Sequence, residues 1–254
     1  LGDQIPSRQP GITPRGYSFG NSGYKIGNRM RDNLLNCDMD QSAASKARLL
    51  EAETWVFDLD NTLYPASSDV FAQVDERMTR YISDFLDLTL EQAGELRQAY
   101  YLSHGTTMRG LMNHHAMEPG PFLEYVHDID LGNVSPNPSL DRALSRLPGR
   151  KIIYTNGPAD HAHRIMDRLS IGHHFEAVFY IISADYLPKL EPKAYENLVE
   201  RFGLKPGKTV MVEDLARNLG PAAALGMITV WVRNAGDNQG PPPEVDVHHV
   251  VDDL

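Results

Sequence analysis

The stretch Thr54-Trp55-Val56-Phe57-Asp58-Leu59-Asp60-Asn61-Thr62-Leu63-Tyr64 decides the fold. Its first half is a short apolar run that ends in an acid, and it predicts a buried strand of a parallel sheet over residues 54–58. Two carboxylates, Asp58 and Asp60, follow at the strand's end. Ligands of open α/β sheets bind at the carboxyl ends of the strands. The stretch therefore predicts both a central strand and a site.

The chain next changes to a helical period. Residues 70–86 repeat apolar side chains at steps of three and four, which predicts an amphipathic helix. Thr89 and Gln92 form a capping-box pattern for a second helix that runs to about Ser103. Gly105 and Gly110 are expected to interrupt the helices. The helical pattern then continues to Leu147 and ends at Pro148-Gly149.

After residue 148 strands and helices alternate. The predicted strands are 151–155, 177–182, 209–213 and 228–232, and the predicted helices are 159–169, 194–202 and 217–225. This alternation predicts a parallel sheet with helices on both faces.

The predicted fold class is thus α/β, with a Rossmann-like parallel sheet core and an inserted all-helical cap. The core is assigned to residues 49–64 and 149–254, and the cap to residues 65–148. Residues 1–36 are rich in Gly, Pro, Ser, Asn and Arg, and residues 1–48 are expected to be a disordered tail.

Composition excludes some classes of function. The 254 residues carry 24 basic and 34 acidic side chains, a net charge of −10, which does not suit a nucleic-acid polymer as partner. No run approaches the roughly 20 apolar residues of a membrane span, and residues 1–30 lack the apolar run of a signal peptide. Cys37 is the single cysteine, which excludes an internal disulfide. The lone cysteine fits a reducing, cytoplasmic setting. The chain is expected to be a monomer or a homodimer, and neither follows from these features.

Further polar residues follow the other predicted strands. They occur in Tyr154-Thr155-Asn156-Gly157, in Lys189-Leu190-Glu191-Pro192-Lys193 and in Val212-Glu213-Asp214, with Asn218 beyond. Converging carboxylates suit Mg²⁺, and a nearby lysine and threonine suit a phosphate. Taken singly, Asp58 and Asp60 are equally compatible with a turn and a helix cap, and Lys189 with a solvated surface residue.

In their order, these four motifs resemble those of the haloacid dehalogenase (HAD) superfamily, in its phosphatase branch with a helical cap after the first motif. The third motif is usually Lys-Pro-x-Pro, and Leu190 replaces its first proline here. Lys193 is therefore a competing candidate for the motif lysine, although the spacing to Pro192 and Tyr195 favours Lys189.

The resemblance implies roles for these residues. Asp58 is the nucleophile that forms an aspartyl-phosphate, Asp60 is the general acid and base, and Lys189 neutralises charge. Mg²⁺ is expected on Asp58, the Asp60 backbone carbonyl, Asp214 and Glu213. Thr155, Asn156 and Gly157 are expected to hold phosphate oxygens.

The cap segment 100–111 and residues 125–128 resemble pyrimidine 5′-nucleotidase-like members of the superfamily. This implies a nucleoside monophosphate such as UMP or CMP as the small-molecule substrate. Predicted substrate contacts are Tyr64, His104, Thr107 and Arg109, although Tyr100 and Leu111 of the same segment are equally compatible with the cap interior.

Other functions remain open at this stage. They are a phosphatase for another small metabolite such as a sugar phosphate, a haloacid dehalogenase, a phosphomutase, or an inactive phosphate-binding regulator. Dehalogenases of this superfamily lack the acid two positions after the nucleophile and need no metal, so Asp60 favours phosphate chemistry.

The histidines need separate consideration. His114-His115, His173-His174 and His248-His249 are adjacent pairs, a spacing that does not place two rings on one helix face. Without a cysteine partner they do not predict a zinc site. His173 and His174 are expected at a helix-to-strand corner.

Overall fold

The computed structural model describes residues 47–234 and 245–254. The predicted disordered tail, residues 1–48, therefore lies almost wholly outside the described residues, and residues 47–50 are helical.

In the described part of the chain, six parallel strands form one sheet in the order β3-β2-β1-β4-β5-β6. The strands are β1 (Thr54–Phe57), β2 (Arg150–Thr155), β3 (Ala177–Tyr180), β4 (Thr209–Glu213), β5 (Ile228–Val232) and β6 (His249–Val251). The predicted α/β class with a parallel sheet is confirmed. β1 lies at the centre between β2 and β4, so the stretch that follows it emerges between two neighbouring strand ends.

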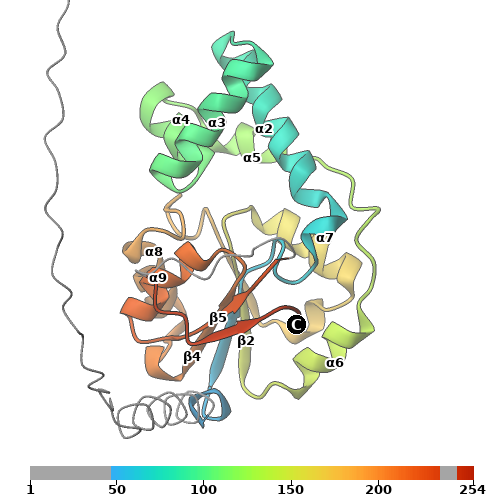
Figure 1. The fold of residues 1–254 in the computed structure, drawn as a ribbon, viewed down its shortest axis with the longest axis vertical. Helices are drawn as coiled ribbons and strands as arrows, with labels where there is room; N and C mark the ends of the chain where they lie inside the picture. Colours follow the sequence, from blue (N-terminus) through green and yellow to red (C-terminus); the bar gives the residue numbers. More distant parts are fainter. Residues whose placement is uncertain (1–46, 235–244) are drawn as a thin grey trace, which may run out of the picture. The chain divides into compact units, whose positions relative to one another are not determined.

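Helices cover both faces of the sheet (Figure 1). α7 (Ala159–Leu169) lies on one face, and α8 (Pro192–Phe202) and α9 (Ala216–Ala224) lie on the other. Successive side chains of a strand point to opposite faces, so β1 contributes to two cores. Phe57 packs in the cluster that contains Ile165 of α7, whereas Val56 packs in the cluster that contains Leu198 of α8.

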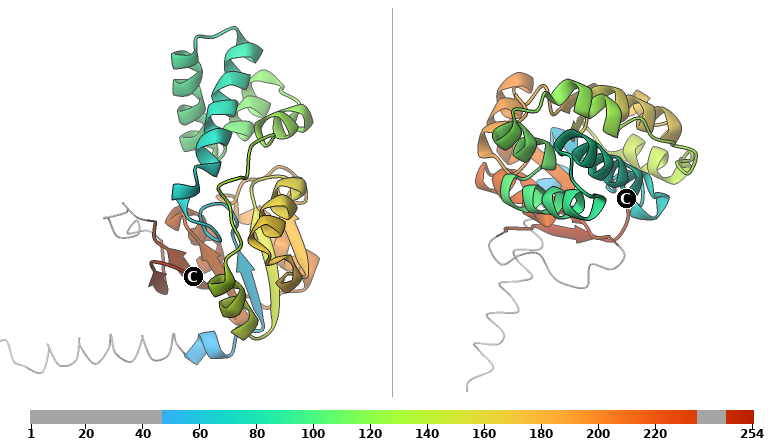
Figure 2. Two further views of the ribbon diagram at one scale, coloured as in Figure 1. Left: turned by 90° about the vertical axis from the view of Figure 1, so that its right-hand side faces the viewer. Right: turned by 90° about the horizontal axis from the view of Figure 1, so that it is seen from above.

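Between β1 and β2 the chain is helical. It forms the single 3-10 turn η1 (Ala66–Ser68), then α2 (Val70–Leu86), α3 (Leu90–His104), α4 (Thr107–His115), α5 (Pro119–Val126) and α6 (Pro138–Arg146). Figure 2 shows α2 to α5 grouped beyond the end of the sheet toward which the strand arrows point. The predicted capping box forms, because Thr89 and Gln92 bond each other's backbone N–H groups.

The two cap glycines differ from each other. Gly105 separates α3 from α4 with a φ of +80°, as the predicted interruption requires. Gly110 instead lies inside α4, where an added Cβ would meet the Tyr100 ring at 2.3 Å. Gly110 therefore lets α4 approach α3 closely, and its prediction as a break is wrong.

The position of α6 also differs from the prediction of a cap that extends to residue 148. The Asp141 carboxylate of α6 accepts a hydrogen bond from His174 at 2.7 Å, and Asn137 N–H donates to the Leu169 carbonyl of α7. α6 thus packs beside the sheet core, well away from α2 to α5 (Figure 2). The period of a short amphipathic helix shows that one face is buried but not against which partner.

Two arginines of α7 fix the segment that returns from the cap. Arg164 donates to the carbonyls of His127 and Ile129 at 3.0 and 2.7 Å. Arg168 donates to those of Val134 and Gly132 at 3.1 and 3.2 Å. The path from α5 to α6 is thus held against the core by charge-assisted hydrogen bonds.

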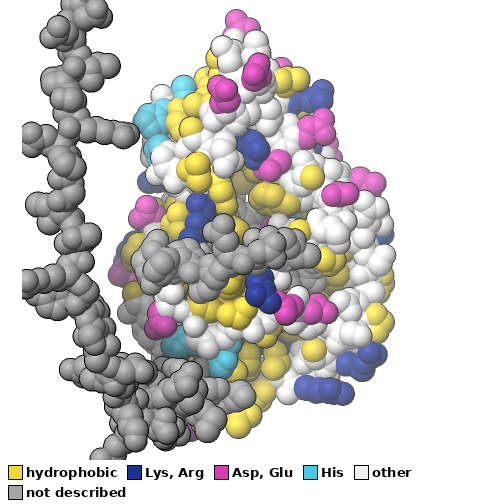
Figure 3. All heavy atoms as spheres, in the orientation of Figure 1, with side chains coloured by type: hydrophobic (Ala, Val, Ile, Leu, Met, Phe, Trp, Pro, Cys, Tyr) yellow, Lys and Arg dark blue, Asp and Glu magenta, His cyan; other side chains and the backbone are white. Residues whose placement is uncertain are grey.

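Most predicted boundaries agree with the structure within two residues. The third predicted strand, 177–182, is shorter because residues 181–186 turn, and β6 was not predicted. Within residues 47–234 and 245–254, no helix has both the length and the apolar character to cross a bilayer. Acidic and basic side chains are interspersed over the face in Figure 3, and histidines gather over α4.

Candidate active site

The neighbouring ends of β1, β2 and β4 bring distant motifs together. Asp58 follows β1, Thr155 ends β2 and Glu213 ends β4. Asp58 N–H donates to the Val212 carbonyl at 2.9 Å, which extends the β1–β4 ladder to the aspartate itself. Its position is therefore set by sheet hydrogen bonding rather than by a free loop.

Asp58 lies between a lysine and a threonine. The Lys189 ammonium donates to one carboxylate oxygen, and the Thr62 hydroxyl donates to the other at 2.8 Å. Lys189 is 2% exposed and also donates to Glu213 at 2.8 Å. Burial, together with the nearby charge of Glu213, raises the pKa of Asp58 to about 7 despite Lys189. Burial alone would lower the pKa of Lys189, but the two carboxylates raise it above its usual range.

The structure places Lys189, and not Lys193, at this site. Lys193 lies on α8 with its ammonium 3.2 Å from Glu196, and it is largely exposed. Lys189 instead lies in the loop before Pro192, where Asn156 accepts its backbone N–H at 3.2 Å. The substitution of the usual proline by Leu190 leaves this placement intact.

Glu213 and Asp214 are also held by neighbours. Asn218 of α9 donates to Glu213 at 2.5 Å, and Asn234 donates to Asp214 at 3.1 Å. The Trp231 indole donates to the Asp214 backbone carbonyl at 2.7 Å. Burial, followed by the charges of Glu213 and Asp58, raises the pKa of Asp214 to about 9.

Three of these carboxylates fit a hard divalent cation. Asp58, Glu213 and Asp214 are all buried, and one ligand oxygen from each lies within 4.8 Å of the others. The raised pKa values of Asp58 and Asp214 reflect negative charge that the Lys189 ammonium does not offset. An oxygen-only donor set with excess negative charge is the chemistry that Mg²⁺ prefers. The predicted ligands Asp58, Asp214 and Glu213 are thus brought together, with Asp60 two residues along the chain.

Asp60 has contacts of its own. Its Oδ1 lies 2.6 Å from the Tyr64 hydroxyl and 2.7 Å from Nε2 of His161, and Thr155 donates to its Oδ2 at 3.5 Å. Burial would raise its pKa, but the hydrogen bonds and charge of His161 hold the pKa of the carboxyl well below its usual range. The environments of Asp58 and Asp60 thus shift their pKa values in opposite directions.

The imidazoles of His161 and His127 lie next to each other beside Asp60. The rings of His161 and His127 lie 4.9 Å apart, and His127 bonds the Leu123 carbonyl at 2.8 Å. Burial, with the neighbouring His161, lowers the pKa of His127 to about 4. Nδ1 of His161 is buried and makes no hydrogen bond within the described structure.

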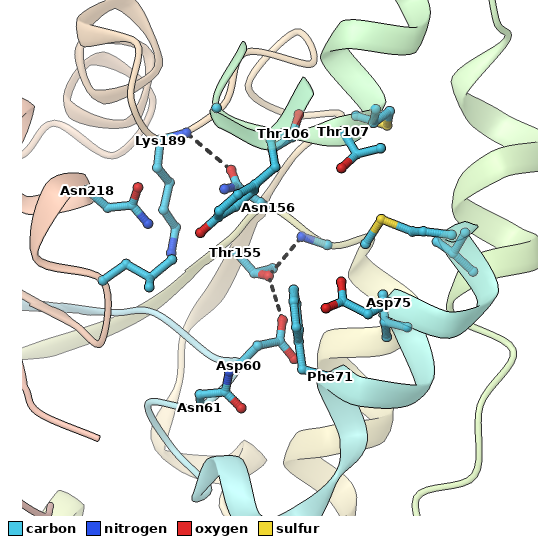
Figure 4. A pocket seen from close by; sticks show the side chains of 18 of the residues that line it. Asp60, Asn61, Phe71, Asp75, Thr106, Thr107, Thr155, Asn156, Lys189 and Asn218 are labelled. Atoms are coloured by element: carbon cyan, nitrogen blue, oxygen red, sulfur yellow. Dashed lines mark hydrogen bonds between the residues drawn. The ribbon is translucent and has the colours of Figure 1, made fainter. Parts of the chain in front are cut away.

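The ends of β1, β2 and β4 open into a cavity of about 280 Å³ between the sheet and the cap (Figure 4). The acidic floor of the cavity, as we name it, consists of Asp58, Asp60, Lys189, Glu213 and Asp214. Beside it lie Thr155, Asn156 and Gly157. The Thr155 hydroxyl accepts the Gly157 N–H at 2.9 Å, so this turn is bonded to itself as well as to Asp60.

The cap wall of the cavity consists of Phe71, Asp75, Arg97, Tyr101, Thr106 and Thr107. Arg97 donates to Asp75 at 2.5 Å, and its Nε is buried without a partner among the described residues. Arg217 of α9 lies 4.0 Å over the Tyr101 ring, which connects the cap wall to the core. Figure 4 shows Phe71 and Asp75 rising from α2 beside the Asp60 and Thr155 pair.

Of the four predicted substrate contacts in the cap and the nucleophile loop, only one lines the cavity. Thr107 lines the cavity, but its hydroxyl donates to the Arg97 carbonyl at 3.0 Å. His104 lies at the end of α3, 3.1 Å from His114, and neither it nor Arg109 is among the cavity-lining residues. Tyr64 is 4% exposed and directs its hydroxyl to Asp60. For His104, Arg109 and Tyr64 the structure thus gives positions outside the cavity lining.

Several cavity residues were missed from the sequence: Asp75, Arg97, Tyr101, Arg217 and His127, with His161 just behind. One signal for His161 existed. It lies four and eight residues before Ile165 and Leu169, on the buried stripe of α7, so it was a polar residue on an apolar face. Asp75 and Arg97 carry no such signal, because either residue is ordinary on a helix surface.

A parallel sheet with an aspartate pair at its central strand and a lysine–carboxylate cluster beside it defines the class of protein. The chain matches the haloacid dehalogenase-like hydrolase family over residues 53–226, more than half of its length, and it belongs to that family.

Two curated proteins are similar to the chain. "Phosphate metabolism protein 8" of Saccharomyces cerevisiae is 24% identical over 193 residues, which is 69% of this chain and 60% of the yeast protein. The chain thus spans less than two thirds of that relative. "Glyceraldehyde 3-phosphate phosphatase" of Methanopyrus kandleri is 28% identical over 211 residues, or 75% of this chain and 88% of that protein.

Solved structures share the fold. The L-2-haloacid dehalogenase of Xanthobacter autotrophicus aligns with a TM-score of 0.52 at 16% identity, covering 80% of this chain and 95% of that one. A HAD phosphatase of Thermococcus onnurineus aligns with a TM-score of 0.52 at 19% identity, covering 79% and 94%. Because both a dehalogenase and a phosphatase align equally well, the chemistry must be argued from the site.

Proposed function

We propose that this chain is a magnesium-dependent phosphomonoester hydrolase that works through an aspartyl-phosphate on Asp58. The observation that carries the proposal is the second carboxylate: Asp60 lies beside the nucleophile and is held by His161 and Tyr64. The resemblance to the superfamily implies that its dehalogenases lack this acid. A leaving alkoxide needs a proton, whereas a leaving halide does not.

The first half-reaction is a displacement at phosphorus. A carboxylate oxygen of Asp58 forms a bond to phosphorus while the bond to the leaving alkoxide breaks, and Asp60 gives the alkoxide a proton. Lys189 neutralises charge on Asp58 and on the phosphoryl group in a water-poor site. Asp58, Asp214, Glu213 and the Asp60 backbone carbonyl would hold Mg²⁺, which would neutralise charge as the two anions approach each other.

The second half-reaction hydrolyses the aspartyl-phosphate. Asp60, now ionised, removes a proton from water, whose oxygen bonds to phosphorus as the bond to Asp58 breaks, and phosphate leaves. In the free protein the low pKa of Asp60 keeps this carboxylate ionised at neutral pH. For the acid role, a dianionic phosphate nearby raises the pKa of Asp60, so that the Asp60–His161 pair holds the proton.

Thr155, Asn156 and Gly157 support phosphate binding at the cavity's inner end. They line the cavity at the end of β2, next to Asp60. In this proposal the Thr155 hydroxyl and the nearby backbone N–H groups hold phosphate oxygens. The Asn156 side chain already accepts the Lys189 N–H, so it orders the loop rather than contacting substrate.

For the substrate we propose a nucleoside monophosphate, with UMP and CMP as first choices. Phe71 and Tyr101 offer aromatic faces for a base, and Asp75 and Thr106 offer hydrogen bonds for sugar hydroxyls. The cavity of about 280 Å³ is slightly smaller than the roughly 300–1,000 Å³ of most small-molecule sites, which favours one compact monophosphate.

A second candidate is a smaller phosphorylated metabolite such as a sugar or triose phosphate. The name of the Methanopyrus kandleri relative favours it, since that protein aligns over 88% of its length. The two candidates differ in the need for Phe71 and Tyr101, because a triose phosphate presents no flat ring to them.

One experiment tests both the proposed reaction and the proposed substrate. Phosphate release is measured with p-nitrophenyl phosphate, UMP, CMP, AMP, a hexose phosphate and glyceraldehyde 3-phosphate, with excess Mg²⁺ or with EDTA, and 2-chloropropionate is assayed for halide release. We expect Mg²⁺-dependent phosphate release with the pyrimidine nucleotides preferred. Folded protein that releases no phosphate from any substrate would overturn the hydrolase proposal, and it would favour a regulator. Halide release alone would favour a dehalogenase, and a phosphoryl group moved within the hexose would favour a mutase.

A further inference from the structure

A second cluster of metal-ligand atoms lies away from the cavity. Asp141 on α6 meets His173 and His174 on the 3-10 turn η2 (Gly172–His174). α6 leads into the start of β2, and η2 leads into the start of β3, so the cluster lies near the amino ends of the strands. The candidate active site lies at the carboxyl ends. The two sites therefore occupy opposite edges of the sheet.

The two imidazoles converge on one oxygen. Nε2 of His174 lies 2.7 Å from Oδ1 of Asp141, and Nε2 of His173 lies 3.2 Å from the same atom. One ligand atom from each of the three residues lies within 4.8 Å of the others. Tetrahedral Zn²⁺ with bonds of about 2.0–2.1 Å holds its ligand atoms about 3.3 Å apart, so small side-chain rotations suffice.

The exposure of the His173 side chain indicates that a local hydrogen bond alone does not explain its position. The His174 side chain is 10% exposed and is already held by Asp141, whereas the His173 side chain is 64% exposed and yet points at the same carboxylate. An exposed imidazole gains little from one further long hydrogen bond in water. A cation shared by the three groups accounts for the convergence of both rings.

We propose that Asp141, His173 and His174 form a transition-metal site whose natural occupant is Zn²⁺. Two imidazoles and one carboxylate suit Zn²⁺, whereas Mg²⁺ prefers an all-oxygen site such as the acidic floor. The metal joins α6 to η2, two segments that flank α7, and so it acts as a structural clamp. The sequence does not predict this site, because the two histidines are adjacent and the third ligand lies 32 positions before His173 (173 − 141).

The test uses the untagged full chain, stripped of metal with a chelator and titrated with Zn²⁺ by calorimetry in excess Mg²⁺. The variants are His173→Ala, Asp141→Asn and the double variant H173A/H174A. His114→Ala is the matched control, because His114 lies 3.1 Å from His104 in a surface histidine pair for which no carboxylate completes a three-ligand group among the described residues.

We expect the wild type and His114→Ala to bind one equivalent of Zn²⁺ that the double variant does not bind. His173→Ala and Asp141→Asn should weaken this equivalent by at least about tenfold. Saturating Zn²⁺ should raise the Tm of the wild type by about 5–10 °C and leave the Tm of the double variant unchanged.

Equal Zn²⁺ binding by the wild type and the double variant would overturn the proposal, as would loss of the equivalent in His114→Ala. Because His174 is nearly buried, the double variant can lose stability without its metal. His173→Ala guards against that outcome, since an exposed side chain can be removed while the metal-free Tm stays the same. A metal-free His173→Ala protein of normal Tm that still binds Zn²⁺ like the wild type would equally refute the site.

Discussion

The acidic floor and the cap wall of the cavity are held in different ways. Asp58, Lys189 and Glu213 are each at most 5% exposed, and each makes at least two hydrogen bonds to other side chains. In the cap wall, Phe71 is 38% exposed, and the Asp75 and Arg97 side chains are 36% and 22% exposed. These floor side chains are thus buried and fixed by several hydrogen bonds, whereas these three wall side chains are partly exposed.

This difference suggests a division of labour. Chemistry needs groups fixed within a fraction of an ångström, and buried hydrogen-bonded residues on strand ends meet that need. Selection among leaving groups needs only differences in contact, which a partly exposed wall can supply. Substitutions in the floor should therefore reduce turnover of every phosphate ester, and substitutions in the wall should change the ranking of substrates.

The largest effect should follow from Asp58→Asn. An amide is a poor nucleophile, so turnover of p-nitrophenyl phosphate should fall by about 10⁴-fold or more. The change is isosteric and relieves carboxylate repulsion, so the Tm should not decrease. Steady-state kinetics and a thermal melt check both statements. A variant that keeps more than about one hundredth of the activity would mean that Asp58 is not the nucleophile.

Removal of the metal from the acidic floor should lower turnover by a comparable amount. EDTA should abolish turnover and Mg²⁺ should restore it, because Asp58, Glu213 and Asp214 otherwise repel an anionic substrate. Activity that persists undiminished in EDTA would refute a metal-dependent floor.

Metal binding should also depend on pH. Without metal, the folded-state pKa values of Asp58 and Asp214, about 7 and about 9, lie above the unfolded value of about 3.9. The folded protein then binds more protons than the unfolded chain, so its stability falls as the pH rises through this window. Mg²⁺ binds the ionised carboxylates. The Tm of the EDTA-treated protein should thus fall between roughly pH 5 and pH 9, and the increase in Tm caused by Mg²⁺ should grow over the same range. A metal-free Tm that rises with pH would contradict these shifts.

A matched lysine pair tests the floor next. Lys189→Met should lower kcat by about 10²- to 10³-fold. It removes the positive charge that stabilises the negative charge developing on the phosphoryl group in the transition state. It also leaves Asp58 and Glu213 without their shared cation, so the Tm should fall unless the pH is lowered. Lys193→Met changes an exposed pair with Glu196 and should leave kcat and Tm nearly unchanged. The reverse ranking of the two variants would assign the motif lysine to Lys193.

A smaller effect is expected behind the floor, at His161. This buried imidazole positions Asp60 but does not line the main cavity, so His161→Asn should lower kcat by about 10- to 100-fold and leave KM unchanged. His163→Asn, on the exposed face of the same helix, is the control and should behave as the wild type. If His161→Asn changes KM and not kcat, its role lies in binding rather than in positioning Asp60.

The floor was also the part that the sequence could predict. Each floor residue follows a short apolar strand or lies in a fixed-length motif, and strand order in a parallel sheet brings the strand ends to one edge whatever the details of packing. β4 and β5 have the predicted bounds, because a buried parallel strand is a continuous apolar run between turns.

The wall could not be predicted in the same way. Which cap residues face the cavity depends on how α2 to α5 pack on each other and how residues 127–137 return along α7, and these are tertiary contacts. His104 and Arg109 looked suitable from their chemistry, but α3 and α4 turn them away from the cavity lining. β6 was missed for a related reason, since a three-residue strand has too few residues to show a period.

The smallest and most specific effect should come from Asp75→Asn in the cap wall. Asp75 is the partner of Arg97, so the substitution weakens a carboxylate contact for sugar hydroxyls and also leaves the guanidinium charge less compensated. We expect kcat/KM to fall by about tenfold for UMP, to stay within about twofold for p-nitrophenyl phosphate, and to rise for substrates with a second anionic group. Asp84→Asn, at an exposed position of the same helix, should change none of these values. If Asp75→Asn instead lowers turnover of all phosphate esters alike, the wall takes part in the chemistry, and the proposed separation of floor and wall is wrong.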